Sequence, residues 1–163
     1  MRLRVLDRIE EGQRADIFAP APGERAYKAF RRNTKSAEPH IAQRAFASEI
    51  NAYTIATRHP TLRLHVPAFF GQVRVSEVLD QDGSDISKQY WLYLCYGMAR
   101  LQPDPQECKV TGLFDGPEWH RVAPFVDQFD EAGIDLGDAS VFYLRTEHLV
   151  FVDFRMNERA SAC

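Results

Sequence analysis

Cysteine is scarce in this chain, which has three cysteines among 163 residues. Cys95, Cys108 and Cys163 are widely spaced and form no CxxC pair, so they predict neither a disulfide framework nor a zinc site. This usage is typical of a reducing compartment, and we expect a cytoplasmic protein, or one exported by a route that needs no hydrophobic signal. Long apolar runs are lacking as well, so we expect neither a hydrophobic targeting segment nor contact with a membrane.

An excess of positive charge is also lacking. The chain has 20 basic and 23 acidic residues and a formal net charge of -3, which gives no electrostatic footprint for nucleic acid. Hydrophobic residues make up 45% and charged residues 26%, an ordinary composition for a globular protein. The length fits one compact domain, or two small lobes that share a cleft.

Five segments of the first hundred residues have the composition of strands. They lie at residues 3–9, 17–18, 26–30, 66–75 and 90–96. In the third of them, Tyr27 and Ala29 alternate with Lys28 and Phe30, as expected for a strand whose two faces have different surroundings. Apolar residues at helical spacing predict a helix from Ser36 or Glu38 to about residue 59, before a proline.

The remaining residues predict a helix and a hairpin. Residues 103–117 are rich in proline and glycine and predict a loop, and residues 119–131 have the apolar spacing of a second helix. Short apolar strands are expected near residues 141–143 and 149–152. Strands followed by a helix, more strands, a helix and a hairpin indicate an α+β fold.

Two acidic motifs lie in the last quarter of the chain. Residues 133–141 read GIDLGDASV, and residues 150–155 read VFVDFR. This layout resembles protein kinases, whose catalytic loop reads HRDLxxxN and whose metal loop reads DFG. Asp135 matches the catalytic aspartate, Ser140 stands at the position of the asparagine, and Asp153 matches the metal-binding aspartate.

The first hundred residues carry further parts of this resemblance. Lys28 lies in AYKA, which resembles the VAIK strand, and Glu49 lies within the following helix, as the kinase glutamate does. Gly12 matches one glycine of the phosphate-binding loop, and Met98 ends the strand that would lead into the hinge. Burying an unpaired ammonium is costly, so Lys28 in an apolar strand also calls for a carboxylate partner, which Glu49 could supply.

The resemblance implies the division of the chain. Residues 1–100 would form a kinase N-lobe with about five antiparallel strands and one long helix. Residues 101–163 would form a minimal second lobe with a helix, a hairpin and remnants of the catalytic and metal loops. The two lobes would make a single compact unit.

The resemblance also implies the cofactors ATP and Mg. Lys28, paired with Glu49, would hold the phosphates of the nucleotide. Gly12 in the phosphate loop and Met98 at the hinge would complete the nucleotide site.

The implied reaction is phosphoryl transfer to an acceptor that the sequence does not identify. Asp135 would be the catalytic residue that positions the acceptor hydroxyl. Asp138 is a second candidate, because Gly137-Asp138 resembles the Gly-Asp dipeptide of kinase-like small-molecule phosphotransferases. Asp153 would bind the metal, and the Ser140 hydroxyl would assist it as a weaker ligand.

Several departures from the kinase pattern leave alternatives open. Gly133 replaces the histidine of the catalytic loop, Ser140 replaces the asparagine, and Arg155 replaces the glycine of the metal loop. Arg155 could stabilise transferred charge or occupy the place of the metal. The chain could therefore be an inactive pseudokinase that binds a protein partner as an inhibitor or adaptor. A third possibility is an unrelated α+β binding domain.

Overall fold

The structure is a computed structural model, and it describes residues 1–20, 23–32, 39–101, 106–114, 116–144 and 148–157. By its internal contacts the chain divides into two units. The first comprises Met1–Ala47 and Phe69–Arg100, and the second comprises Ser48–Ala68 and Leu101–Cys163. The long helix α1 (Pro39–Arg58) contributes residues to both units.

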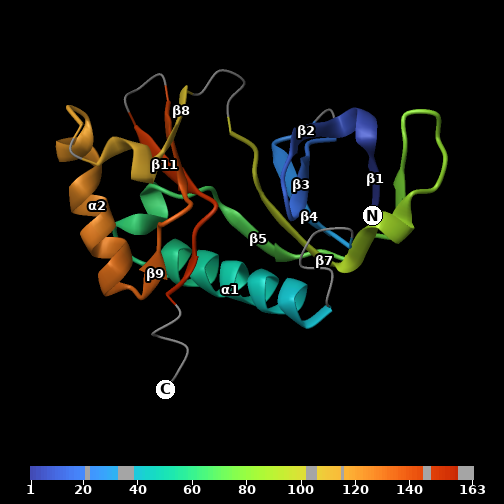
Figure 1. Cartoon of the computed structure of the whole chain (residues 1–163), viewed down its shortest axis with the longest axis horizontal. Coiled ribbons are helices and arrows are strands. Elements are labelled where there is room, and N and C mark those ends of the chain that lie inside the picture. The colour runs from blue at the N-terminus through green and yellow to red at the C-terminus, as the bar shows by residue number, and fades with distance from the viewer. Residues whose placement is uncertain (21–22, 33–38, 102–105, 115, 145–147, 158–163) are drawn as a thin grey trace. The chain divides into compact units, whose positions relative to one another are not determined.

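A five-stranded antiparallel sheet forms the first unit (Figure 1). In spatial order its strands are β2 (Arg8–Glu11), β3 (Ala15–Phe18), β4 (Arg25–Arg31), β7 (Tyr90–Ala99) and β5 (Phe69–Gln72). Strands β4 and β7 are interior strands, since each is paired on both sides. The predicted α+β class, with a five-stranded antiparallel sheet and a long helix, is confirmed.

The two faces of this sheet pack against different residues. On one face, the ring of Phe30 in β4 lies 5.6 Å from that of Phe46 in α1, and Phe46 lies 6.2 Å from Tyr96 in β7. The other face carries Ala29. It belongs to a buried apolar cluster that also contains Leu3, Phe18, Val75, Val78, Tyr90 and Cys95. Neighbouring residues of β4 thus enter separate cores, because side chains alternate along a strand.

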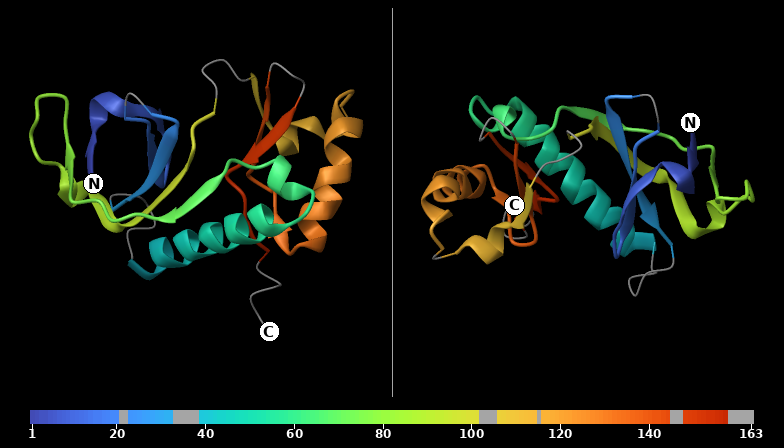
Figure 2. Two further views of the ribbon diagram at one scale, coloured as in Figure 1. Left: turned by 180° about the vertical axis from the view of Figure 1, so that it is seen from behind. Right: turned by 90° about the horizontal axis from the view of Figure 1, so that it is seen from above.

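A short parallel pair of strands contributes to the second of these cores. Strand β1 (Arg2–Arg4) pairs with β6 (Glu77–Leu79), and both Leu3 and Val78 are fully buried. Figures 1 and 2 show β1 across from β3 and β4, so that the strands curve around the cluster. The 3₁₀ turn η1 (Val5–Asp7) separates β1 from β2, whereas the sequence predicted one strand over residues 3–9.

The second unit contains a three-stranded antiparallel sheet and the helix α2 (Trp119–Glu131). The sheet order is β11 (Leu149–Val152), β10 (Ser140–Tyr143) and β8 (Gln106–Lys109). Phe151 of β11 packs between aromatic rings, with Phe125 at 5.7 Å and Phe129 at 5.2 Å. A two-stranded pair joins β9 (Ile134–Asp135) to β12 (Arg155–Met156).

The structure corrects two of the predicted segments. Within the predicted strand at residues 66–75, only β5 is a strand. The predicted loop at residues 103–117 contains the strand β8 and the 3₁₀ helix η4 (Val110–Leu113). The sequence did not predict β8, because this strand is stabilised by pairing with β10 rather than by its own strand propensity. The remaining short helices are η2 (Leu62–Leu64) and η3 (Ser87–Gln89).

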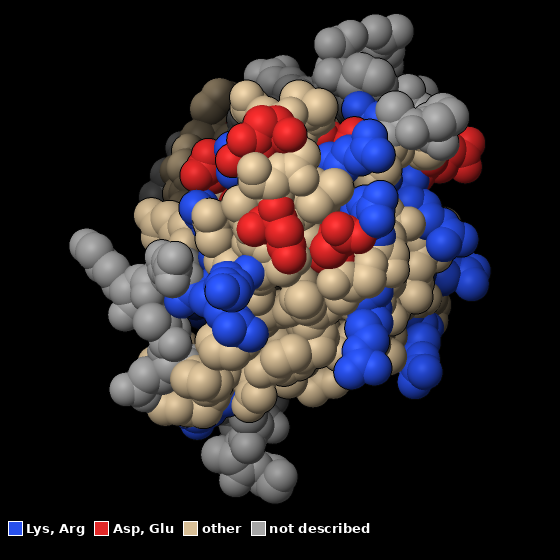
Figure 3. Space-filling model, turned by 90° about the vertical axis from the view of Figure 1, so that its right-hand side faces the viewer, with Lys and Arg blue, Asp and Glu red and all other residues tan. Residues whose placement is uncertain are grey.

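No helix among the described residues has both the length and the apolar character needed to cross a bilayer. Basic and acidic side chains are intermingled on the face of the molecule drawn in Figure 3, with acidic groups at its centre and basic groups around them.

Candidate functional site

The predicted site residues divide between the two units. Gly12, Lys28 and Met98 belong to the first unit, and the second contains the acidic and hydroxyl groups: Glu49, Asp135, Ser140 and Asp153. Strand pairing places Lys28 and Met98 on neighbouring strands of the first unit, and it places Asp135 and Ser140 beside the segment that carries Asp153 in the second.

In the first unit, Lys28 lies on the interior strand β4. It is half-buried and stands in register with Tyr96 of β7 and Ile17 of β3. Its ammonium lies 5.9 Å above the ring of Phe30, a weak cation–π contact. Met98 pairs with Ala26, two residues before Lys28, so both side chains project from the same face of neighbouring strands.

Gly12 forms the turn between β2 and β3. Its amide donates a hydrogen bond of 3.0 Å to the carbonyl of Ala15. A Cβ atom at this position would lie 2.4 Å from the same carbonyl oxygen, so any other residue would force the turn to shift. This turn therefore explains the glycine without a ligand, and the predicted contact of Gly12 with phosphate stays a prediction.

In the second unit, Asp135 is paired with Arg155. The two are register partners of β9 and β12, and Arg155 Nε donates to Asp135 Oδ2 at 3.2 Å. Asp135 Oδ1 accepts the amide of Gly137 at 2.8 Å, which fixes the carboxylate in a turn. The arginine that replaces the kinase glycine thus binds the predicted catalytic aspartate.

Ser140 is fully buried, yet its hydroxyl meets a charged group. Lys109 of β8 donates to Ser140 Oγ at 2.7 Å and to the carbonyl of Asp138 at 3.3 Å. The other neighbour of Ser140 in the sheet is Val152, the residue before Asp153. Strand pairing therefore places Ser140 and Asp135 beside the two ends of the short segment 152–155 that carries Asp153.

Asp153 has a left-handed backbone, with φ of 60°. It is the one non-glycine residue with positive φ among the described residues. Aspartate tolerates this conformation better than most residues, but it still costs free energy, and such residues are concentrated at functional sites. The backbone thus changes direction at Asp153, directly after β11 ends at Val152, and the binding of a metal by Asp153 stays a prediction.

Glu49 lies half-buried in the part of α1 that belongs to the second unit. The neighbouring Ser48 accepts the amide of Met156 at 3.0 Å, which ties this turn of the helix to β12. Tyr53, one turn further along, packs against Phe154 with tilted rings whose centroids are 4.3 Å apart. The residues that flank Asp153 are therefore held by α1 as well as by the sheet.

One charged cluster was missed in the sequence. Asp16 of β3 is fully buried, and its Oδ2 accepts hydrogen bonds from Tyr90 at 2.6 Å and Arg8 at 3.3 Å. Arg31 lies 3.5 Å from the other carboxylate oxygen and also contacts Glu11 at 3.0 Å. Burial raises the pKa of Tyr90, and its hydrogen bond to Asp16 raises it further. The sequence signal that could have revealed this cluster is the aspartate within the apolar strand β3.

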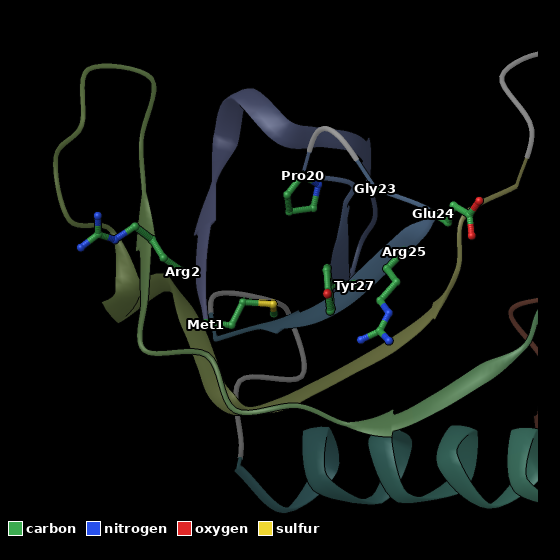
Figure 4. A pocket seen from close by; sticks show the side chains of 7 residues that line it. All are labelled: Met1, Arg2, Pro20, Gly23, Glu24, Arg25 and Tyr27. Atoms are coloured by element: carbon green, nitrogen blue, oxygen red, sulfur yellow. The ribbon is translucent and has the colours of Figure 1, made fainter.

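A separate hollow of about 650 Å³ opens on the first unit (Figure 4). It is lined by Met1, Arg2, Pro20, Gly23, Glu24, Arg25 and Tyr27. The side chain of Arg2 extends away from the others and pairs with Glu77. None of the predicted site residues lines this hollow, and its polar groups do not converge on one point.

The donor set for Mg²⁺ can be tested on these contacts. The described residues contain no cluster of three or more histidine, cysteine, aspartate or glutamate side chains suited to a metal ion. Mg²⁺ bound with a nucleotide needs only one or two carboxylates besides phosphate and water, so Asp153 fits this role. The Ser140 hydroxyl fits it poorly, because it already accepts a hydrogen bond from the positive Lys109.

No protein-family model matches the chain, and no curated protein is significantly similar to it.

Proposed function

We propose that this protein is a small kinase-like phosphotransferase that binds Mg-ATP and transfers its γ-phosphoryl group to an acceptor of unknown identity. The supporting fold has three strands, a long helix and two more strands, all five in one antiparallel sheet. This is the element order that the kinase resemblance requires for its N-lobe. The strand with the predicted phosphate-binding lysine neighbours the strand that leads to the predicted hinge.

The observation that carries the proposal is the pairing around Asp153. Three residues chosen from sequence alone, Asp135, Ser140 and Asp153, lie on strands and turns that pair around one four-residue segment. Asp153 also has the strained backbone expected of a residue held for function. An accidental match of motifs would not require these positions to be neighbours, since 18 residues separate Asp135 from Asp153.

Within this proposal the chain's own groups have distinct roles. Lys28 binds phosphate oxygens with its ammonium, and Glu49 has the role of the helix glutamate that the kinase resemblance implies. Asp153 holds the metal, which when bound neutralises charge on the phosphates. Asp135 orients the acceptor hydroxyl, and this requires the exposed Arg155 pair to open or to shift.

Thermal unfolding with and without ATP and Mg²⁺ tests the binding step. A ligand that binds only the native state stabilises it by about 2.7 kcal/mol at a hundredfold excess over its Kd. We expect a Mg²⁺-dependent rise in Tm that is lost in Lys28→Ala and in Asp153→Ala. The exposed Lys88 and Asp127 provide matched controls, and their alanine variants should keep the full rise. A flat response of the unmodified protein would refute the proposal.

The pseudokinase alternative is favoured by two contacts. Arg155 pairs with the predicted catalytic Asp135, and Lys109 donates a hydrogen bond to the Ser140 hydroxyl that would assist the metal. The exposed Phe114, stacked on the half-buried Trp119 at 4.3 Å, offers an apolar contact for a protein partner. Release or transfer of labelled γ-phosphate separates the two functions: ATP binding without turnover, in the presence of varied acceptors, is the outcome that the pseudokinase predicts.

A further inference from the structure

Lys109 occupies an unexpected position in the second unit. It is the last residue of β8 and stands in register with Ser140, the residue that replaces the kinase asparagine. Its ammonium donates to Ser140 Oγ at 2.7 Å and to the Asp138 carbonyl at 3.3 Å. The next residue, Val110, donates its amide to Ala139, so the sheet itself fixes the end of β8 against this loop.

The contact places the ammonium of Lys109 at an atom that the kinase pattern gives to a metal ion. In kinases the metal-loop aspartate and the catalytic-loop asparagine hold two Mg²⁺ ions between them. A divalent ion bound to Ser140 Oγ would lie beside the ammonium, and the two positive charges would repel each other at this short range. Ser140 is fully buried, so its hydroxyl is the desolvated end of the contact.

The ammonium of Lys109 also has the chemistry to bind an anion. Lysine is a point-charge donor with three N–H groups, and its two contacts with described residues use two of them. The residue as a whole is exposed, so an anion can reach it from solvent. Both contacts are to neutral oxygens, which orient the ammonium without cancelling its charge.

We propose that Lys109 is a resident cation of the nucleotide site, which binds the polyphosphate directly and takes the place of the second Mg²⁺ ion. Asp153 then holds a single divalent ion, and Ser140 positions the lysine instead of binding metal. The inference rests on the proposed function, since it assigns the second cation of that same site.

ATP binding measured by calorimetry in excess EDTA and in excess Mg²⁺ tests this inference. The variants are Lys109→Met, which keeps most of the length of the side chain without its charge, Lys109→Arg, and the control Lys88→Met. In EDTA we expect Lys109→Met to weaken ATP binding by about tenfold or more, the size of one charge-assisted hydrogen bond. The loss should be smaller in Mg²⁺, because added metal can then replace the missing charge. Lys109→Arg should bind ATP nearly as the unmodified protein does.

The number of metal ions gives a second readout that does not depend on activity. Mn²⁺ titrated into the complex with a non-hydrolysable ATP analogue should bind with a stoichiometry of one. Two bound Mn²⁺ ions in the unmodified protein would overturn the inference. So would equal ATP affinities of Lys109→Met and Lys88→Met in EDTA.

These outcomes separate the inference from the function on which it rests. ATP binding that is normal in every Lys109 variant removes the role of Lys109 and leaves the kinase-like site intact. The absence of ATP binding by the unmodified protein in both media refutes the proposed function, and the inference with it. Melting curves without nucleotide establish that each variant is folded before it is scored.

Discussion

Arg155 and Asp135 are register partners on β12 and β9, and their side chains form an ion pair of 3.2 Å. The pair links the segment after Asp153 to the start of the predicted catalytic loop. Its two side chains are 42% and 36% exposed, so water screens the interaction. Such a pair orients the aspartate at little cost and can be opened by a competing ligand.

We therefore expect Arg155→Ala to have little effect on folding. Exposed ion pairs contribute about 0–1 kcal/mol, and the free energy of unfolding in urea should fall by no more than this. Arg2→Ala, which removes the similarly exposed pair with Glu77, is the matched comparison. A loss of several kcal/mol in Arg155→Ala alone would mean that the pair holds β9 and β12 together.

Asp16 should behave in the opposite way. Its carboxylate is fully buried among Arg8, Arg31 and Tyr90. Asp16→Asn removes the buried charge and leaves Arg8 and Arg31 with the exposed Glu11 as their remaining shared carboxylate, so we expect a loss of about 3 kcal/mol in the free energy of unfolding. Glu11→Gln changes an exposed member of the same cluster and should cost less than about 1 kcal/mol. Equal effects of the two substitutions would contradict the importance of burial here.

The turn at Gly12 gives a third prediction. In Gly12→Ala the new methyl group would meet the Ala15 carbonyl oxygen at 2.4 Å, so the turn must deform, and we expect a loss of about 1–3 kcal/mol. At Gly112 a methyl group would have no neighbouring atom within 4 Å, so Gly112→Ala should be neutral or slightly stabilising. Chemical denaturation of both variants measures the difference, and a neutral Gly12→Ala would show that the turn is adaptable.

Stability should also depend on pH through His65. Burial lowers the pKa of His65 below its usual 6.5, and the adjacent His148, stacked on it at 4.8 Å, lowers it further against an opposing hydrogen bond to the Leu149 carbonyl. The unfolded chain therefore binds a proton at a higher pH than the native protein does. The contribution of His65 to the free energy of unfolding is therefore constant above about pH 7 and falls as the pH drops through 6.5.

Urea unfolding between about pH 8 and pH 5 checks this sign. The slope below pH 6.5 should be smaller in His65→Gln, and the exposed His120→Gln should retain the slope of the unmodified protein. An unchanged slope in His65→Gln would assign the pH dependence to other groups.

Much of the secondary structure was predictable because local signals agree with the final fold. The alternation of Tyr27, Lys28, Ala29 and Phe30 predicted a two-faced strand, and β4 has this form between two cores. Apolar spacing predicted both helices, and residues 119–131 are the bounds of α2. The single strand predicted at residues 3–9 was wrong, and the strand at residues 106–109 was missed. Pairing with distant segments decides where such short strands begin and end.

The sequence by itself determined which chemistry is present: a lysine in an apolar strand, and acidic residues after short apolar runs. These motifs could be recognised in the sequence because each apolar strand and the polar residue beside it are close in the chain. The partners of these groups were decided by tertiary structure alone. Lys109 meets Ser140 across 31 residues, Arg155 meets Asp135 across 20, and Tyr90 meets Asp16 across 74. No local pattern encodes such contacts, because they depend on sheet register, and a shift of one residue would turn each side chain to the opposite face.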